Sequence, residues 1–444
     1  MQRSRNGRRA RSARSAPDTA NGSRQAQRAR QRALCVAAAA EGGEQLEELA
    51  ELLWTAGVAT VGELVQRRER PHPNTYLGPG KVQEAASIAR ACDANLIACD
   101  DELSARQERN LEQELGLPVV DRTAVILDIF AAHAASAEGK LQVELAQLEY
   151  NLARMRGLWS HLERLGGGIG TRGPGETQIE TDRRLARNRI AALRRRLEHV
   201  KGTREVQRAQ RERAALPSIA LVGYTNAGKS TLLNGLTDAQ AGVGDRLFHT
   251  LDPMIRSLRI DGRPYLLTDT VGFISKLPHQ LVDAFTATLE ETRRADLLAH
   301  VLDASAPETR ARAMQRAVEQ ALSQIGAGDR PRLLVLNKAD LLDEAGREEL
   351  RLCHPDAVLV SGRTGEGLAA LTQRIEHELA HTARRVDLLV PYAEGASLAE
   401  LHALAGSVSR QDTPEGVRVR ALMPPRLAAR FARFAVAGPS PRPA

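Results

Sequence analysis

"GYTNAGKS", residues Gly223–Ser230, has the pattern G-x-x-x-x-G-K-S within this chain of 444 residues. An apolar run, Ile219–Val222, precedes it, and the helical segment "TLLNGLT" (Thr231–Thr237) follows it. A strand, a glycine-bearing turn and a helix in this order place backbone N–H groups around phosphates at a helix N-terminus. Lys229 can then reach the β- and γ-phosphates, and the Ser230 hydroxyl can ligate Mg²⁺. The stretch therefore predicts a nucleotide-phosphate site at the end of a parallel strand.

Two further motifs follow at the ends of apolar runs: "DTVG" (Asp269–Gly272) and "NKAD" (Asn337–Asp340). Asp269 fits the carboxylate that supports Mg²⁺, and the Gly272 N–H can contact a γ-phosphate. The Asp340 carboxylate can accept hydrogen bonds from both N1–H and the 2-amino group of guanine, a donor pair that adenine lacks. The order of the motifs predicts a GTP-binding G domain.

We expect the nucleotide site to include four segments, each at the end of a predicted strand. Its predicted residues are Gly223, Tyr224, Thr225, Asn226, Ala227, Gly228, Lys229, Ser230, Thr231, Asp269, Thr270, Val271, Gly272, Asn337, Lys338, Ala339, Asp340, Ser361, Gly362 and Arg363.

Three positions bear on metal binding and catalysis. Ser230 and Thr250 are the predicted Mg²⁺ ligands, with an ordinary loop hydroxyl as the alternative for Thr250. Asn226 is typical of G domains that use K⁺ beside the phosphates; the alternative is a turn-capping amide. Phe273 stands where Ras-like GTPases carry a Gln that orients the attacking water. We therefore leave the catalytic group unassigned and expect slow intrinsic hydrolysis that depends on a partner.

Charge and composition narrow the class of protein. Residues 1–33 hold ten Arg against one acid, and residues 164–213 hold fourteen Lys or Arg against six acids. Either block could meet nucleic acid, although a solvated leader is the alternative for the first. The apolar runs are too short to span a bilayer, and the four scattered cysteines favour reduced thiols. We expect a monomeric cytoplasmic protein without an integral membrane segment.

The rest of the chain predicts an α/β fold with several parts. Strand-like runs alternate with helical patterns over residues 34–135, which predicts a parallel sheet. Leu141, Leu145, Leu148, Leu152 and Met155 form a heptad seam, continued loosely by Leu162 and Leu165, and a second seam runs through Ala186, Ile190, Leu193, Leu197 and Val200. Two such helices predict an antiparallel hairpin. The segments "RRVDLLVPYAEG", "LAELHALAG" and "GVRVRALMP" predict a small β-α-β unit.

We therefore expect a small N-terminal α/β domain with a long helical hairpin, a central P-loop G domain with a doubly wound sheet, and a small C-terminal α+β domain. The predicted boundaries are a disordered Arg-rich tail at 1–33, the N-terminal domain at 34–137, the hairpin with its Gly-rich tip at 138–214, the G domain at 215–384, the C-terminal domain at 385–437 and a disordered end at 438–444.

The predicted hairpin tip, "GGGIGTRGPGE" (Gly166–Glu176), contains G-x-G-x-x-G. A dinucleotide-binding fingerprint must follow a strand inside a βαβ unit, whereas this one follows a heptad helix. The context therefore disfavours a dinucleotide site. A flexible hinge and a contact with a partner both remain.

Five further motifs lie outside the G domain: "YLGPGK" (Tyr76–Lys81), "DDELS" (Asp100–Ser104), "DRTAVILDIFA" (Asp121–Ala131), "EGKLQVELAQL" (Glu138–Leu148) and "GGGIGTRGPGETQIETDRR" (Gly166–Arg184). With these motifs the chain resembles the HflX family of ribosome-associated GTPases. The resemblance covers roughly residues 45–435. The chain departs from the family pattern at Gly362-Arg363, where the family usually continues with Ala, at Met254 and at His249.

The resemblance implies GTP-dependent binding to the large ribosomal subunit and its rRNA, dissociation of stalled or idle 70S ribosomes, and hydrolysis that times release. A ribosome-silencing factor without splitting activity is the alternative. It also implies that the hairpin tip approaches ribosomal RNA, where glycines permit a close backbone approach and arginines meet phosphates. The implied RNA-contact residues are Gly168, Gly170, Arg172, Gly173, Arg183 and Arg184.

Overall fold

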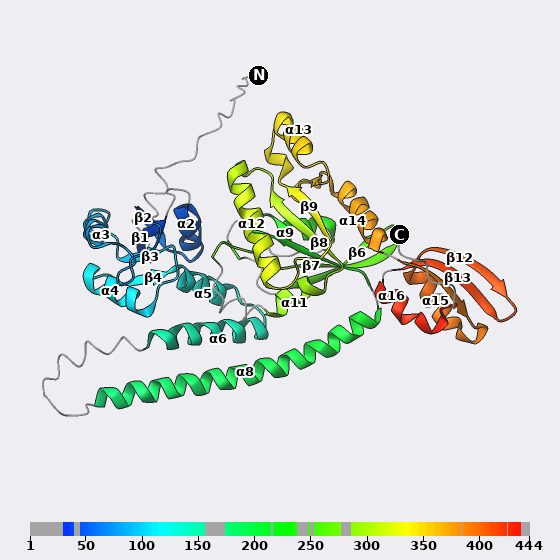
Figure 1. Ribbon diagram of the computed structural model, residues 1–444, viewed down its shortest axis with the longest axis horizontal. Helices are drawn as coiled ribbons and strands as arrows, with labels where there is room; N and C mark the ends of the chain where they lie inside the picture. The colour runs from blue at the N-terminus through cyan, green and yellow to red at the C-terminus, as the bar shows by residue number, and fades with distance from the viewer. Residues whose placement is uncertain are drawn as a thin grey trace, which may run out of the picture. The chain divides into compact units, whose positions relative to one another are not determined.

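The computed structural model describes residues 30–39, 45–155, 174–214, 216–237, 247–248, 253–276, 286–382, 384–423 and 425–436. The chain divides into two compact units, residues 1–125 and 126–444. Figure 1 shows the helices and strands of each unit. None of the helices within these ranges is long and apolar enough to cross a membrane.

The first unit is built on a parallel sheet of four strands in the order β2-β1-β3-β4. This confirms the predicted parallel sheet, whose first strand is buried on both faces as parallel strands usually are. The strand begins at Arg32, two residues inside the stretch predicted as a tail. The elements are β1 (Arg32–Ala39), α2 (Gln45–Thr55), β2 (Ala59–Arg67), α3 (Pro79–Ala91), β3 (Leu96–Cys99), α4 (Ala105–Leu115) and β4 (Val119–Asp121).

Two of the sequence motifs meet in this unit as a buried ionic cluster at the carboxyl ends of β3 and β4. The Arg122 guanidinium donates to Asp100 Oδ1 at 2.7 Å and lies 2.6 Å from Glu48 Oε2. Asp121 accepts hydrogen bonds from the backbone N–H groups of Leu103 and Ala124. Because a buried charge is tolerated only when it is paired, removal of one partner from "DDELS" or "DRTAV" would leave an uncompensated charge at this end of the sheet.

Helices α5 (Arg122–His133), α6 (Ala137–Arg154) and α8 (Pro174–Ala214) follow, and α6 and α8 lie side by side (Figure 1). The predicted seams are confirmed in part, since Leu141, Leu193 and Leu197 form a buried cluster flanked by Leu145 and Leu148. The other described seam residues lie outside this cluster: Ala186 and Ile190 are buried, and Leu152, Met155 and Val200 are half-buried. Ion pairs Arg189–Glu144 and Arg194–Glu149 also join the two helices. Leu162 and Leu165 lie outside the described residues.

Helix α8 begins earlier than the sequence indicated. Gly175 and Glu176, predicted as the end of the glycine-rich loop, lie in its first turn after Pro174. Proline is well tolerated at the start of a helix because its missing N–H would have no partner there. The remaining tip residues, 166–173, lie outside the described part of the chain.

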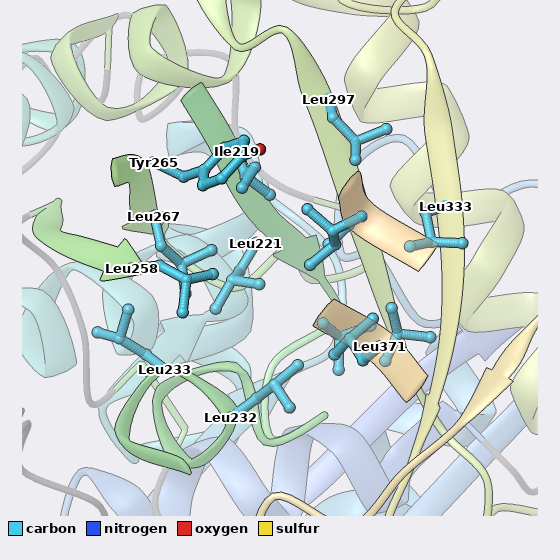
Figure 2. Close-up of a cluster of buried hydrophobic side chains, with 14 of the residues drawn as sticks. Ile219, Leu221, Leu232, Leu233, Leu258, Tyr265, Leu267, Leu297, Leu333 and Leu371 are labelled. Carbon is cyan, nitrogen blue, oxygen red and sulfur yellow. The ribbon is translucent and has the colours of Figure 1, made fainter. Parts of the chain in front are cut away.

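The central sheet has the strand order β10-β9-β8-β5-β7-β6, with all pairs parallel except β6–β7. The doubly wound prediction is thus confirmed, and β6 adds an antiparallel edge strand. Figure 2 shows the core on one face of this sheet, where Ile219 and Leu221 of β5 meet Leu232 and Leu233 of α9. The elements are β5 (Ser218–Gly223), α9 (Lys229–Leu236), β6 (Met254–Ile260), β7 (Arg263–Asp269), α11 (Thr286–Arg294), β8 (Leu297–Asp303), α12 (Glu308–Gln324), β9 (Arg332–Asn337), η1 (Ala339–Leu341), α13 (Glu344–Cys353), β10 (Val358–Leu359) and α14 (Leu368–Thr382).

The C-terminal segment corrects the predicted β-α-β unit. It has three antiparallel strands in the order β11-β13-β12, because "GSVSRQDT" forms an additional strand paired with the next one. Val408 is the only apolar side chain of that stretch, which lacks the alternation that predicts a strand, so its strand depends on pairing. The elements are β11 (Arg384–Val390), η2 (Tyr392–Glu394), α15 (Gly395–Leu404), β12 (Gly406–Thr413), β13 (Gly416–Met423), α16 (Pro425–Arg430) and η3 (Ala432–Phe434).

The burial of His300 in β8 predicts that the stability of the central sheet depends on pH. Its side chain is 3% exposed, and burial lowers its pKa from 6.5 to about 4. The unfolded chain therefore binds a proton at a higher pH than the folded chain. The stabilisation is complete above about pH 6.5 and falls by roughly 1.4 kcal/mol for each pH unit towards 4.

We expect His300→Leu to remove this dependence. Between pH 7.5 and pH 5, the free energy of unfolding of the unmodified chain should fall by about 2 kcal/mol more than that of the variant. Urea unfolding followed by release of a fluorescent GDP analogue measures the transition of this domain. An identical pH dependence in both proteins would show that His300 does not titrate on unfolding.

Candidate functional site

The phosphate loop joins β5 to α9 at the carboxyl edge of the central sheet. Lys229 is 6% exposed, and its ammonium donates to the carbonyls of Gly223 at 3.1 Å and Tyr224 at 2.8 Å. Burial lowers the pKa of Lys229 to about 8, although the nearby Asp269 carboxylate opposes the shift. Asn226 and Gly228 have φ of +61° and +88°, left-handed backbone that lets the loop curl before the helix begins. The loop thus holds an ammonium and a helix N-terminus together, a combination that binds phosphate.

The end of β7 brings an acid to this loop. Asp269 is fully buried and accepts a hydrogen bond from Ser230 Oγ at 2.6 Å. A hydroxyl and a carboxylate oxygen at this separation are ligands of the kind that Mg²⁺ prefers, so the residues fit that metal. The Thr270 hydroxyl donates to the Leu221 carbonyl at 2.7 Å and so secures the turn to β5.

Asn337, at the end of β9, connects three of the predicted segments. Its amide Nδ2 donates to the Ala227 carbonyl, and its Oδ1 accepts the Gly362 N–H, both at 2.9 Å. The side chain therefore braces the phosphate loop against both segments predicted to surround the base. Both contacts are with backbone groups, the Ala227 carbonyl and the Gly362 N–H.

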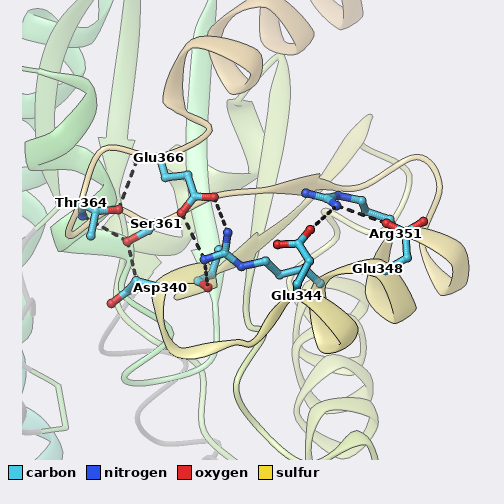
Figure 3. A network of polar contacts seen from close by, with 9 residues as sticks. Asp340, Glu344, Glu348, Arg351, Ser361, Thr364 and Glu366 are labelled. Carbon is cyan, nitrogen blue, oxygen red and sulfur yellow. Dashed lines mark hydrogen bonds and ion pairs between the residues drawn. The ribbon is translucent and has the colours of Figure 1, made fainter.

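Ser361 acts on Asp340 in this structure. The Ser361 hydroxyl is fully buried and donates to Asp340 Oδ1 at 2.6 Å, while the Thr364 N–H donates to Ser361 Oγ at 3.1 Å (Figure 3). The half-buried Asp340 carboxylate is thus held in one orientation. One oxygen is fixed by serine, which orients the group for planar recognition of two donors.

The sequence analysis missed three residues that support these loops. Asp303 at the end of β8 pairs with Lys338 at 2.6 Å. Arg347 of α13 pairs with Glu366 at 2.8 Å and donates to the Ala339 carbonyl at 2.9 Å. Arg347 therefore ties the segment after β9 to the segment after β10. No local motif marks it, because its partners lie eight and nineteen residues away.

The structure describes only some of the other candidate residues. Thr250 and the tip residues Gly168, Gly170, Arg172 and Gly173 lie outside the described residues. Arg183 and Arg184 lie on α8, with Arg184 exposed. Phe273 is 3% exposed, so its ring is buried at the position where a polar group could have oriented water.

Arg347→Met should loosen the base-binding loops. We expect the affinities for GTP and GDP to fall together by roughly three- to tenfold, since two hydrogen-bonded connections are lost. Arg351→Ala is the matched control, because Arg351 lies on the same helix and pairs only with Glu344 and Glu348 among the described residues. Fluorescent GDP titration with GTP competition measures both affinities. Equal affinities in Arg347→Met and the unmodified protein would contradict the role of this brace.

A doubly wound sheet with the phosphate loop, the "DTVG" turn and the "NKAD" turn along one edge defines a P-loop GTPase. Such an enzyme binds GTP and hydrolyses it to GDP. The chain is 47% identical over 384 residues to a protein named GTPase HflX from Lacrimispora saccharolytica, which covers 86% of this chain and 90% of that protein. It is 45% identical over 377 residues to GTPase HflX of Escherichia coli, covering 83% and 88%. The chain belongs to the HflX family of GTPases, which confirms the resemblance seen in the sequence.

Three family models match consecutive parts of the chain. Their descriptions are "GTP-binding GTPase N-terminal" for residues 43–131, "GTP-binding GTPase Middle Region" for residues 133–211 and "50S ribosome-binding GTPase" for residues 218–338. Among solved structures, the crystal structure of a GTP-binding protein from Sulfolobus solfataricus in complex with GDP is 27% identical, with a TM-score of 0.41, and covers 78% of this chain and 98% of that one.

Proposed function

We propose that this GTPase binds the large ribosomal subunit and dissociates 70S ribosomes, and that hydrolysis times its release. The observation that carries the proposal is the arginine-rich surface of α8. Arg184, Arg187 and Arg196 are exposed and have no acidic partner within the described ranges, whereas Leu193 and Leu197 are buried against α6. A helix that buries one apolar stripe and carries exposed arginines around the rest of its surface suits contact with RNA phosphates.

The similarities support the same partner. The family model over residues 218–338 is described as a 50S ribosome-binding GTPase. The glycine-rich tip between α6 and α8 would then approach RNA, with Gly168, Gly170 and Gly173 admitting backbone and Arg172 meeting phosphate. A hinge is the competing role of that tip.

The nucleotide site would act with Mg²⁺. Ser230 and Thr250 would ligate the ion and Asp269 would support it, since the hydroxyl and carboxylate oxygens fit this metal. The metal would neutralise charge on the phosphates. K⁺ beside Asn226 would be a further requirement, tested by replacing K⁺ with Na⁺ at constant ionic strength. GTP would order Thr250 and "DTVG" and favour the ribosome-bound state.

Hydrolysis measured with and without purified large subunits, at fixed salt, tests the proposal. We expect strong stimulation by the subunits, because buried Phe273 cannot orient water unaided. The variant Arg184→Ala/Arg187→Ala/Arg196→Ala should lose most of the stimulation and keep its basal rate. Unchanged hydrolysis in the presence of subunits would refute a ribosome-activated GTPase.

Sedimentation of 70S ribosomes with the protein and GTP separates splitting from silencing. Splitting predicts that the 70S peak falls while both subunit peaks rise. A silencing factor would bind the ribosomes and inhibit translation while leaving the 70S peak intact. Arg189→Ala is the control variant, because Arg189 also lies on α8 but pairs with Glu144. It removes one arginine from the helix and leaves Arg184, Arg187 and Arg196 in place.

A further inference from the structure

The segment after β7 is attached to the phosphate loop by a short parallel bridge. Tyr224 and Phe273 pair as bridge partners. The Thr225 N–H donates to the Phe273 carbonyl at 2.8 Å, and the Phe273 N–H donates to the Gly223 carbonyl at 3.0 Å. Backbone of the "DTVGF" segment is therefore in register with backbone of the phosphate loop.

The side chain of Tyr224 makes a second connection beside this bridge, to Ser275, and we call this pair of residues the clasp. The Tyr224 hydroxyl lies 2.5 Å from Ser275 Oγ and accepts a hydrogen bond from the Ser275 N–H at 2.7 Å. Tyr224 itself is 6% exposed. Its carbonyl meanwhile accepts a hydrogen bond from the Lys229 ammonium at 2.8 Å. One residue therefore contacts both the phosphate-binding lysine and the segment that must respond to GTP.

Gly272 lies next to this bridge, against the phosphate loop. Gly272 immediately precedes the bridged Phe273, and a Cβ built on it would lie 2.9 Å from Thr225 Cα and 3.0 Å from Lys229 Nζ. Such approaches admit no side chain, so the backbone of Gly272 passes directly over the phosphate loop beside the ammonium. The N–H of Gly272 is the group of this segment that we predict to contact a γ-phosphate.

We propose that Tyr224 is a positioning residue for the γ-phosphate, which holds Gly272 over the phosphate loop through its hydroxyl contact with Ser275. Phe273 supplies no polar side chain at the next position, so the backbone of this segment carries the recognition of the γ-phosphate. GDP has no γ-phosphate, so its binding does not depend on the position of Gly272. The clasp therefore contributes to the preference for GTP over GDP and leaves the binding of GDP unchanged.

The test compares affinities for GTPγS and GDP, both with Mg²⁺, in Tyr224→Phe and Ser275→Ala. Tyr224→Phe keeps the buried ring and removes the hydroxyl. We expect the GTPγS affinity to fall roughly three- to tenfold in each variant, the cost of one to two hydrogen bonds, with GDP affinity unchanged. Hydrolysis should show a raised KM. Tyr265→Phe is the matched control, since Tyr265 is a buried tyrosine of β7 that lies outside the clasp.

The double variant Tyr224→Phe/Ser275→Ala sharpens the result. Tyr224→Phe removes both hydrogen bonds to Ser275, and Ser275→Ala removes only the one between the two hydroxyls, so the double variant should lose little more than Tyr224→Phe alone. Equal losses for GTPγS and GDP would overturn the proposal and assign Tyr224 to stability of the phosphate loop. Unchanged affinities for both nucleotides, or additive losses in the double variant, would overturn it as well.

Discussion

Asp340→Asn is expected to weaken GTP binding by roughly 10²- to 10⁴-fold, the largest effect on affinity among the substitutions considered. The carboxylate accepts two hydrogen bonds from guanine in our interpretation, and a hydrogen bond to a charged group contributes about 1.5–3 kcal/mol. Ser361 donates to Asp340 Oδ1 and can donate equally to an amide oxygen. The new amide nitrogen would then face the base and oppose the guanine donors.

The same geometry predicts a gain for another base. Xanthine carries a carbonyl where guanine carries the 2-amino group, so the amide introduced by Asp340→Asn could donate to it, and XTP should bind the variant more tightly than GTP. Competition against a fluorescent GDP analogue gives both affinities, with the exposed neighbour substitution Leu341→Ala as control. GTP affinity retained within a factor of about three would exclude Asp340 from the base site.

Lys229→Met is expected to reduce GTP hydrolysis by roughly 10²- to 10³-fold, because catalysis of phosphoryl transfer rests on electrostatic stabilisation by fixed groups. Methionine keeps an unbranched stem in the buried site but leaves the Gly223 and Tyr224 carbonyls without their donor. The charge that compensates the phosphates is lost at the same time. Phosphate release at saturating GTP measures the loss in turnover.

Lys229→Arg separates charge from shape. The guanidinium keeps the charge but is planar and larger than the buried ammonium, and it cannot reproduce the same contacts with the two carbonyls, so we expect this variant to stay impaired. A Lys229→Met enzyme that turned over within about tenfold of the unmodified enzyme would show that the ammonium is not central to the reaction.

Local sequence spacing was sufficient to predict several parts of this protein. The phosphate loop, the "DTVG" turn and the "NKAD" turn each follow a strand of the central sheet, as their spacing indicated. These motifs can be recognised in the sequence because their geometry depends on backbone turns and on residues a few positions apart. The α6–α8 seams could be predicted for the same reason, since helical periodicity alone sets which side chains share a face.

Tertiary structure decided the features that join distant segments. The polar stretch of β12 becomes a strand because β13 pairs with it, and α8 extends into residues predicted as loop. Tyr224 meets Ser275 across 51 residues, and Lys338 meets Asp303 across 35. No periodicity or motif encodes such pairs, because their partners are set by which strands become neighbours in the sheet. The sequence by itself determined the motifs that we predict to bind GTP, whereas the order of the strands determined which side chains hold those motifs in place.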